Sequence, residues 1–319
     1  MSKDTQILLT GATGFVGTAL MKSLENNSQY NVIGLCRILP EKVEAANLVA
    51  LGDLATADFA QVLQDKSVVV HAAARAHIMH DEVIDPLSEY RKVNVEATLR
   101  LAKQALEAGV KRFIFISSVG IHGLNSTQPF QEVDQPLPHD PYTVSKLEAE
   151  QGLTKLVKNT SMELVIIRPP LIYGGAAPGN FLSLIKLSAK PIPLPFGLVQ
   201  NKRSMVYVEN LVDFILRCIE HPAAANQTFL VSDGEDLSLK KLITYIRQAL
   251  GRPAWLVPVP LCLFKIAGKL TGKSGVVDRL IGDLQVDSSK AQSLLGWKPP
   301  FTVQQGIEQT VVDFKNKEN

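Results

Sequence analysis

Short apolar runs alternate with amphipathic stretches through the first half of the chain. The apolar runs are rich in β-branched residues, as buried strands are, whereas the longer stretches repeat apolar positions at helical spacing. This alternation predicts a parallel, doubly wound α/β sheet covered by helices on both faces, with ligands at the carboxyl ends of the strands. The predicted strands are 7–9, 32–35, 48–51, 68–70, 113–116 and 164–167, and the predicted helices are 18–26, 57–64, 90–108 and 142–157.

The pattern changes after Arg168-Pro169-Pro170, where glycine and proline become frequent. We expect a second, smaller lobe to start here, with a helix over 180–188. Strand patterns at 206–208 and 228–231, separated by a helical pattern at 211–220, indicate that the chain returns to the first unit. The predicted Rossmann-type cofactor domain is therefore 1–170 with a return at about 204–232, and the predicted substrate-binding lobe is 171–203 and 233–319.

The composition is that of a globular enzyme. The chain has 319 residues, of which 46% are hydrophobic and 20% charged, enough for one large or two modest domains. The 33 basic and 31 acidic residues form no basic block, which argues against a nucleic acid as partner. Cys36, Cys218 and Cys262 form no Cys-x-x-Cys pair. They are typical of reduced, buried thiols in a cytoplasmic protein.

No stretch of the sequence has the pattern of a membrane span. The polar residues 1–6 run directly into the first predicted strand, so we expect no signal peptide. No apolar stretch reaches the ~18 residues that a spanning helix needs. Segment 255–270 is the most apolar, but two prolines and the lysines at 265 and 269 interrupt it. We interpret it as a core helix with lysines at its edge rather than a membrane contact.

The first apolar run leads directly into a turn with three regularly spaced glycines. Residues 7–17 read Ile-Leu-Leu-Thr-Gly-Ala-Thr-Gly-Phe-Val-Gly, and a helical pattern follows. Backbone N–H groups at a helix N-terminus favour a diphosphate. Gly11 suits the tight turn, Gly14 lets a pyrophosphate approach the backbone, and Gly17 lets the helix lie close to the strand. The turn predicts a dinucleotide-binding site, although plain structural turns can share this spacing.

A second candidate site lies later in the same predicted domain. Tyr142 and Lys146 are four residues apart on a predicted helix with Asp140 as its N-cap, so their side chains project from one face. A lysine cation beside a phenol lowers the tyrosine pKa from its usual ~10, which suits proton exchange with a sugar or alcohol hydroxyl. Ser117 and Ser118 end a predicted strand, where a hydroxyl could hold the substrate oxygen.

With the glycine turn, the two serines and the Tyr-x-x-x-Lys pair in this order, the chain resembles the extended short-chain dehydrogenase/reductase superfamily, in its nucleotide-sugar epimerase/dehydratase branch. The resemblance covers nearly the whole chain. It implies that Tyr142 is the acid/base and that Lys146 lowers the Tyr142 pKa and holds the nicotinamide ribose. It also implies that Ser118 binds the reacting oxygen, with Ser117 as the fallback.

Further stretches match the cofactor-binding parts of that branch. The loop at His71 resembles one that passes under the cofactor, Asp53 resembles an aspartate that meets the adenine, and Asn94 resembles an asparagine that supports the active lysine through water. Segment 168–174 resembles the one that runs beside the nicotinamide. The residues that the resemblance assigns to the cofactor are Gly11, Thr13, Gly14, Phe15, Val16, Gly17, Arg37, Asp53, Leu54, His71, Ala72, Ala73, Asn94, Ser117, Tyr142, Lys146 and Pro169.

The resemblance also points to a substrate with a diphosphate. Arg203 resembles the arginine that clamps the diphosphate of a nucleotide sugar, since a planar guanidinium suits phosphate oxygens. Its usual acidic neighbour is replaced by Ser204. Arg279 is a second candidate ligand, although it could equally be a surface arginine. Asn180 resembles a residue near the sugar and phosphate, and Gln285 is a candidate for admitting an N-acetyl group.

The residues after the serines discriminate between reactions. A 4,6-dehydratase of this branch needs an acid and a base there, but the chain has Val119 and Gly120, which cannot move a proton. This leaves an epimerase or a reductase. Because the motif set most resembles UDP-glucose and UDP-N-acetylglucosamine 4-epimerases, we expect a nucleotide-sugar 4-epimerase of that type. The alternatives are a reductase of a nucleotide-4-keto-sugar in surface-polysaccharide synthesis, a non-sugar ketone reductase of the same superfamily, and a cofactor-binding protein without catalysis.

The end of the second predicted strand bears on the type of cofactor. The second strand ends without a ribose-binding carboxylate and is followed by Arg37, which can accept a 2′-phosphate, so the sequence favours NADP slightly over NAD. The family implies a homodimer through helices 90–108 and 142–157. His77 and His80 lie near two acidic residues, but no further ligand is spaced to complete a site, so we expect no metal.

Overall fold

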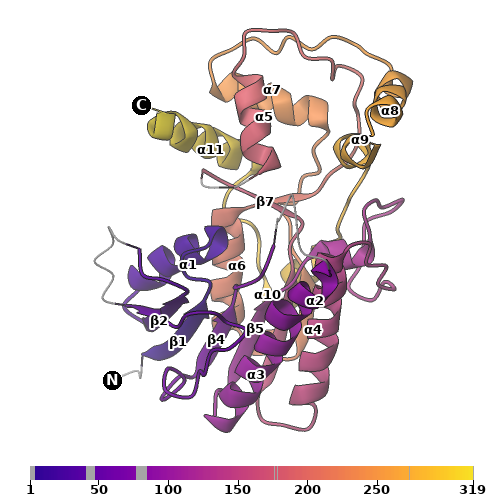
Figure 1. Ribbon diagram of the computed structural model, residues 1–319. Helices are drawn as coiled ribbons and strands as arrows, with labels where there is room; N and C mark the ends of the chain where they lie inside the picture. The colour runs from indigo at the N-terminus through magenta and orange to yellow at the C-terminus, as the bar shows by residue number, and fades with distance from the viewer. Residues whose placement is uncertain are drawn as a thin grey trace.

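The computed structural model describes residues 4–40, 47–76, 85–175, 177, 179–272 and 274–318. Seven parallel strands form its main sheet in the order β3-β2-β1-β4-β5-β6-β9 (Figure 1). The predicted α/β class with a doubly wound parallel sheet is confirmed, and β9 returns the chain to the sheet beside β6. The strands are β1 Thr5–Thr10, β2 Tyr30–Cys36, β3 Leu48–Ala50, β4 Val68–His71, β5 Arg112–Ile116, β6 Glu163–Arg168 and β9 Gln227–Leu230.

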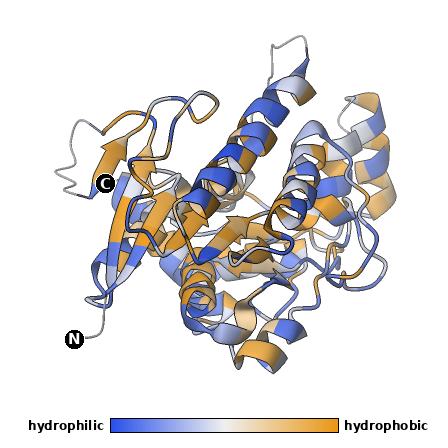
Figure 2. Ribbon diagram, turned by 90° about the horizontal axis from the view of Figure 1, so that it is seen from below, coloured by the Kyte–Doolittle hydropathy of each residue, from blue (hydrophilic) through white to orange (hydrophobic). Residues whose placement is uncertain are grey.

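Helices cover both faces of this sheet because alternate strand residues point to opposite sides. Ile7 and Leu9 pack with α1, α6 and α10, whereas Leu8 packs with α3 and α4. The strands are largely apolar and the helices that cover them carry polar residues outward (Figure 2). The helices of this layer are α1 Phe15–Glu25, α2 Pro86–Arg91, α3 Ala97–Glu107, α4 Pro141–Val157, α6 Val208–Glu220 and α10 Ser289–Leu295.

Two predicted helices differ from the structure. Residues 57–64 form turns rather than a helix, because the Gln104 side chain of α3 binds both the Phe59 N–H and the Asp58 carboxylate and replaces helical hydrogen bonds. The predicted helix 90–108 is three elements, since a π-helical turn, Lys92–Glu96, separates α2 from α3. Single π-helical turns inside helices often lie at functional sites.

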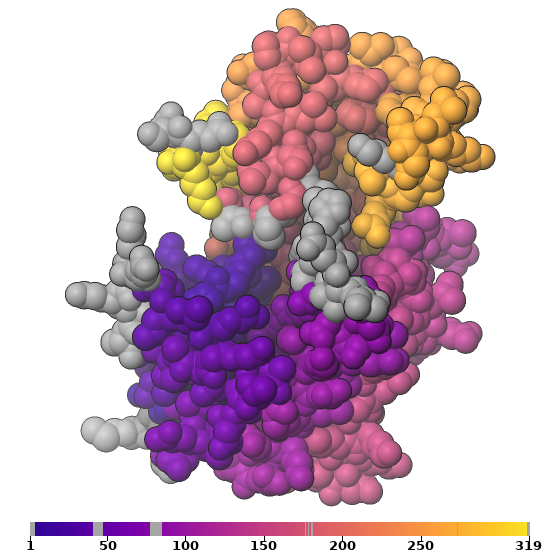
Figure 3. Space-filling model, viewed as in Figure 1, coloured from indigo at the N-terminus to yellow at the C-terminus, as the bar shows by residue number. Residues whose placement is uncertain are grey.

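The second lobe contains the short parallel pair β7 Leu171–Tyr173 and β8 Met205–Tyr207 and lies above the sheet in Figure 1; Figure 3 shows the same lobe at the top of the molecule. Tyr173, Phe181 and Ile307 are part of its core. Within the range predicted as this lobe, Ala291, Leu295 and Trp297 pack into the core of the main sheet instead. The helices of the lobe are α5 Asn180–Ser188, α7 Leu239–Ala249, α8 Leu261–Leu270, α9 Ser274–Ile281 and α11 Val303–Glu318.

The interpretation of segment 255–270 as a core helix is wrong. Gly268 is the one buried residue of α8, and Leu263, Ile266 and Leu270 are exposed. The helical periodicity is present, but the apolar face points outward, and periodicity alone does not say what covers a face. Within the described ranges, none of the helices has the length and apolar character needed to cross a membrane.

Candidate active site

The glycine turn lies between the end of β1 and the start of α1. Gly11 has a φ of +71°, and a Cβ there would lie 2.7 Å from the Ala73 nitrogen; a Cβ on Gly17 would lie 1.9 Å from the Gly11 oxygen. Both glycines are therefore required by the packing of the chain. Gly14, the N-cap of α1, would place its Cβ in contact with the Gly11 oxygen only, at 3.2 Å, and no side chain caps the helix. This open helix N-terminus fits a diphosphate.

His71 at the end of β4 is held inside the protein. Its Nδ1 lies 2.6 Å from the Thr10 hydroxyl and its Nε2 2.8 Å from the Thr98 hydroxyl, and the residue is 1% exposed. Burial and the nearby Lys146 lower the pKa of His71 to about 3, so the ring is neutral. The Thr10 hydroxyl also accepts from the Ala73 N–H. His71 thus positions the loop that faces the glycine turn, and its ring is not available to a cofactor.

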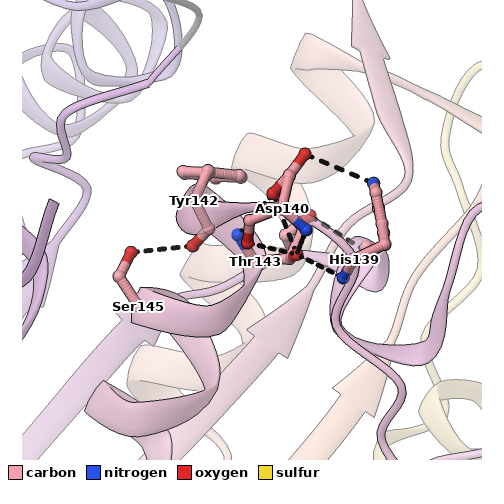
Figure 4. A network of polar contacts seen from close by, with 7 residues as sticks. His139, Asp140, Tyr142, Thr143 and Ser145 are labelled. Carbon is pink, nitrogen blue, oxygen red and sulfur yellow. Dashed lines mark hydrogen bonds and ion pairs between the residues drawn. The ribbon is translucent and has the colours of Figure 1, made fainter. Parts of the chain in front are cut away.

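Tyr142 lies in the first turn of α4, which begins as the sequence predicts (Figure 4). Asp140 and Thr143 form a capping box, in which the Asp140 carboxylate accepts from the Thr143 N–H at 2.8 Å, and the His139 ring lies 3.3 Å from the Asp140 carboxylate. Ser145 Oγ donates to the Tyr142 carbonyl at 2.7 Å. The start of the helix is thereby fixed, and with it the position of the Tyr142 side chain.

The structure brings Ser118, Tyr142 and Lys146 together. The Ser118 hydroxyl is near enough to Tyr142 to lower the pKa of its phenol, and it accepts from the Gly120 N–H at 3.0 Å. Lys146 is 2% exposed, donates to the Ile116 carbonyl at 2.7 Å and lies 4.4 Å from the centre of the Phe115 ring. Burial lowers the pKa of Lys146 to about 7, partly offset by Glu150. The set contains a hydroxyl to hold an oxygen, a phenol to exchange a proton and a cation beside them.

One electrostatic expectation is wrong for the chain on its own. Lys146 was expected to lower the pKa of Tyr142, but burial and the Asp140 carboxylate raise that pKa above its usual value, and the Ser118 hydrogen bond offsets them in part. The physical reason is that Lys146 bonds to the Ile116 carbonyl instead of the phenol. The side chains that would activate the phenol are in place, but the apolar surroundings favour its neutral form.

Asn94 and Ser117 lie beside this set. Asn94 is carried by the π-helical turn, and its amide donates to the Ser145 hydroxyl at 3.0 Å, which ties it to α4 rather than to Lys146. The Ser117 hydroxyl is buried and has no hydrogen-bond partner within the described part of the chain. A buried hydroxyl without a partner costs free energy, and a bound group could satisfy it. Together with the open N-terminus at Gly14, it shows that the residues present fit a dinucleotide.

Three of the residues predicted to lie near the adenine or the nicotinamide form hydrogen bonds that hold their loops in place. The Asp53 carboxylate accepts from the Ala55 N–H, and the Leu54 carbonyl accepts from Arg100. Arg37 is exposed just beyond the carboxyl end of β2. The Pro169 carbonyl accepts from the Val119 N–H at 3.0 Å. These positions are compatible with their predicted roles, and the roles stay predictions.

The two arginines predicted for the diphosphate are neighbours. An Arg203 guanidinium nitrogen donates to the carbonyl of Arg279 at 2.9 Å and to that of Gly282 at 3.2 Å. Burial lowers the pKa of Arg203. The Asp283 carboxylate offsets part of this change, and the nearby cation of Arg279 lowers the pKa further. The backbone of Asn180 begins α5, but its side chain lies outside the described atoms.

The sequence did not reveal the acidic residue that binds Ser204, which is Asp236. Ser204 stands where the family has an acidic residue, and its hydroxyl donates to Asp236, which also accepts from the Gln285 amide. Asp236 follows a turn far along the chain, and no local pattern marks it. Gln285 therefore bonds to an acid of its own chain, and its predicted role toward an N-acetyl group stays a prediction.

Val119 and Gly120 occupy the positions where a dehydratase carries its acid and base. Val119 is buried at the start of a 3-10 turn, and Gly120 follows it with its N–H bound to Ser118. Neither position offers an acid or a base. His77 and His80 lie outside the described residues. Among the residues that are described, no three His, Cys, Asp or Glu side chains are grouped so that they could hold a metal.

The fold and the Ser118, Tyr142 and Lys146 set define a dinucleotide-dependent enzyme of the extended short-chain dehydrogenase/reductase type. Residues 7–232 match the model of the NAD dependent epimerase/dehydratase family, and the chain belongs to that family. The predicted family is thereby confirmed, and with it the use of a nicotinamide dinucleotide. The comparisons give no support to the preference for NADP over NAD.

Similar proteins cover almost the whole chain. The chain is 51% identical over 317 residues to a UDP-glucose 4-epimerase of Vibrio cholerae, which covers 98% of the chain and 96% of that protein. It is 32% identical to the N-acetyl-α-D-glucosaminyl-diphospho-ditrans,octacis-undecaprenol 4-epimerase of Escherichia coli O157:H7, with 97% and 95% covered. The crystal structure of a UDP-glucuronic acid 4-epimerase from Bacillus cereus in complex with NAD matches with a TM-score of 0.79 at 23% identity, covering 98% and 100% of the two chains.

Proposed function

We propose that the protein is a nucleotide-sugar 4-epimerase that interconverts UDP-glucose and its C4 epimer. The observation that carries the proposal is the grouping of the Ser118 hydroxyl, Tyr142 and the buried Lys146, in which Ser118 lowers the Tyr142 pKa, with Val119 and Gly120 in place of a dehydratase acid and base. The Vibrio cholerae relative, at 51% identity, bears the name UDP-glucose 4-epimerase and supports this substrate.

In the proposed reaction the side chains of the chain handle the proton of the C4 hydroxyl. Tyr142 takes the hydroxyl proton as the C4 hydrogen leaves as hydride, and Ser118 holds the oxygen in place. Lys146 stabilises the phenolate when its cation turns toward Tyr142. A bound NAD supplies the acceptor and donor of the hydride. After the keto-sugar turns over, the hydride would return to the other face of C4, and Tyr142 would return the proton to the C4 oxygen.

We propose NAD as the cofactor. The description of the family and the NAD in the Bacillus cereus structure support it. The glycine turn and the free Ser117 hydroxyl would bind it, with residues 1–170 and the return at 204–232 as the cofactor domain and 171–203 and 233–319 as the substrate lobe. Arg37 would then lie near the adenosine without a 2′-phosphate to bind.

The proposal is tested by purifying the protein without added dinucleotide, identifying any bound dinucleotide by mass spectrometry, and following UDP-glucose to UDP-galactose conversion. An epimerase regenerates its cofactor in each turnover, so we expect turnover without added NADH or NADPH. Strict stoichiometric consumption of NADPH with a 4-keto-sugar would establish the reductase instead. Binding of a dinucleotide with no sugar turnover would favour a cofactor-binding protein that has lost catalysis.

Replacing Arg203 by alanine is expected to raise the KM for UDP-glucose by about tenfold or more while kcat changes less. The guanidinium, already next to Arg279, would bind a diphosphate that is present equally in the ground state and the transition state. Initial rates against UDP-glucose concentration measure the effect. Lys240→Ala, on the exposed side of α7, is the control for loss of one cation on the same lobe. An unchanged KM would show that Arg203 does not bind the diphosphate.

We also propose the homodimer that the family implies, through α3, α4 and the turn before α3. The exposed large apolar side chains of the described chain lie elsewhere, since none of them belongs to α3 or α4. The contact would therefore rest on half-buried leucines such as Leu99 and Leu156 together with polar groups. The mass of the particle in solution by light scattering gives the number of chains.

A further inference from the structure

The helix α8 presents an apolar face to solvent. Leu263, Ile266 and Leu270 are 52%, 53% and 83% exposed. Their spacing of three and four residues places them in one row along the helix, which we call the outer row. The opposite side of the helix is the one that packs: a Cβ on Gly268 would lie 2.9 Å from Val277 of α9, and the Phe264 ring stacks on Phe196 with 5.6 Å between centroids.

Other exposed apolar residues lie on α9 and on the segment before α8. Val276 and Leu280 of α9, which packs along α8, are 55% and 38% exposed, and Trp255, in the segment before α8, is 54% exposed. The two helices lie at the outer edge of the second lobe, on the side away from α11 (Figures 1 and 3). Single exposed apolar residues are ordinary on a protein surface, but a cluster on adjacent elements marks an interaction site.

The charged residues of α8 indicate which kind of partner its apolar face fits. Helix α8 contains Lys265 and Lys269 and no aspartate or glutamate, whereas α9 carries the exposed Asp278 next to Arg279. Lys265 and Lys269 are exposed, and their spacing of four places them together beside the outer row. An apolar face flanked by lysines, with a tryptophan nearby, is the pattern of a helix that lies in the interface of a bilayer and meets anionic headgroups.

We propose that α8 docks the protein on the surface of a membrane that contains anionic phospholipid. The outer row enters the boundary between headgroups and acyl chains, and Lys265 and Lys269 meet the lipid phosphates. A second copy of the chain fits less well, because pairing the same faces would bring the lysines of both copies together around one apolar contact.

The test is flotation of the purified full-length protein with extruded vesicles. One set is phosphatidylcholine alone and the other contains about a quarter phosphatidylglycerol. We expect the protein to float with the anionic vesicles and to be released between about 0.1 M and about 0.5 M NaCl. Equal recovery with both sets of vesicles, or no flotation with either, would overturn the proposal.

Variants separate the apolar and the charged contributions. Leu263→Glu with Ile266→Glu should lower the partition coefficient by at least about tenfold, because two carboxylates would enter the interface. Lys265→Glu with Lys269→Glu should lower it by at least about fivefold for each lysine. Val312→Glu on α11, at a residue that is 47% exposed, is the control and should float as the unaltered protein does.

Folding and self-association are measured on the same samples. Thermal unfolding and UDP-glucose turnover should be unchanged in these variants, because none of the substituted residues belongs to the proposed active site. If the Leu263→Glu and Ile266→Glu variant is unstable, the lysine variant tests the docking by itself. A particle mass that falls to that of a smaller assembly in the outer-row variant, with flotation unchanged, would assign this face to a second copy and overturn the membrane proposal.

Discussion

Tyr142→Phe is expected to lower kcat for UDP-glucose by about 10³-fold, because it removes the group that takes and returns the C4 hydroxyl proton. Ser118 and Lys146 would remain and would still bind the substrate oxygen and the cofactor. The bound dinucleotide should therefore persist after purification, and the KM should change little. Steady-state rates together with the mass of the bound dinucleotide measure both expectations.

The control for this prediction is Tyr245→Phe on α7, where a phenol is removed from the second lobe without touching the proposed site. Its kcat should equal that of the unaltered protein. Normal turnover by Tyr142→Phe would exclude the proposed proton transfer. Loss of the dinucleotide in that variant would instead give Tyr142 a role in binding.

Arg168→Met is expected to lower the free energy of unfolding by about 3–5 kcal/mol. The Arg168 guanidinium binds the Glu150 carboxylate at 2.6 Å, and the two side chains are 9% and 5% exposed. Removing one partner leaves a buried charge without its counter-ion, which costs much more than the net value of the pair. Urea unfolding measured by circular dichroism gives the difference.

The same helix supplies the matched control. Glu148 of α4 pairs with Arg91, but these side chains are 31% and 47% exposed, so Arg91→Met should lower the free energy of unfolding far less than Arg168→Met does. Adding Glu150→Leu to Arg168→Met should recover part of the lost stability, because the unpaired carboxylate is then gone. If Arg168→Met and Arg91→Met lowered the free energy of unfolding equally, burial would not increase the contribution of the Arg168–Glu150 pair to stability.

Local patterns in the sequence were sufficient for the elements that hold the cofactor end of the site. Short β-branched runs set the strands of the main sheet, and the cap at Asp140 set the start of α4. The spacing of Tyr142 and Lys146 then determined which face of α4 carries them. These features follow from interactions between residues close in the chain, so periodicity and capping chemistry predict them.

The tertiary structure alone decided the features that depend on distant segments. Asp236 forms hydrogen bonds with Ser204 and Gln285, which lie far from it in the chain. Asn94 bonds to Ser145 from a π-helical turn that no local sequence pattern predicts.

The direction of the apolar face of α8 was also beyond the sequence. The sequence pattern of an amphipathic helix is the same whether its apolar side packs inward or faces solvent. The sequence by itself determined the sheet, the glycine turn and the Tyr-x-x-x-Lys helix, because short-range propensities specify them. Packing between segments far apart in the chain decided the surroundings of Tyr142 and Arg203 and the outward face of α8.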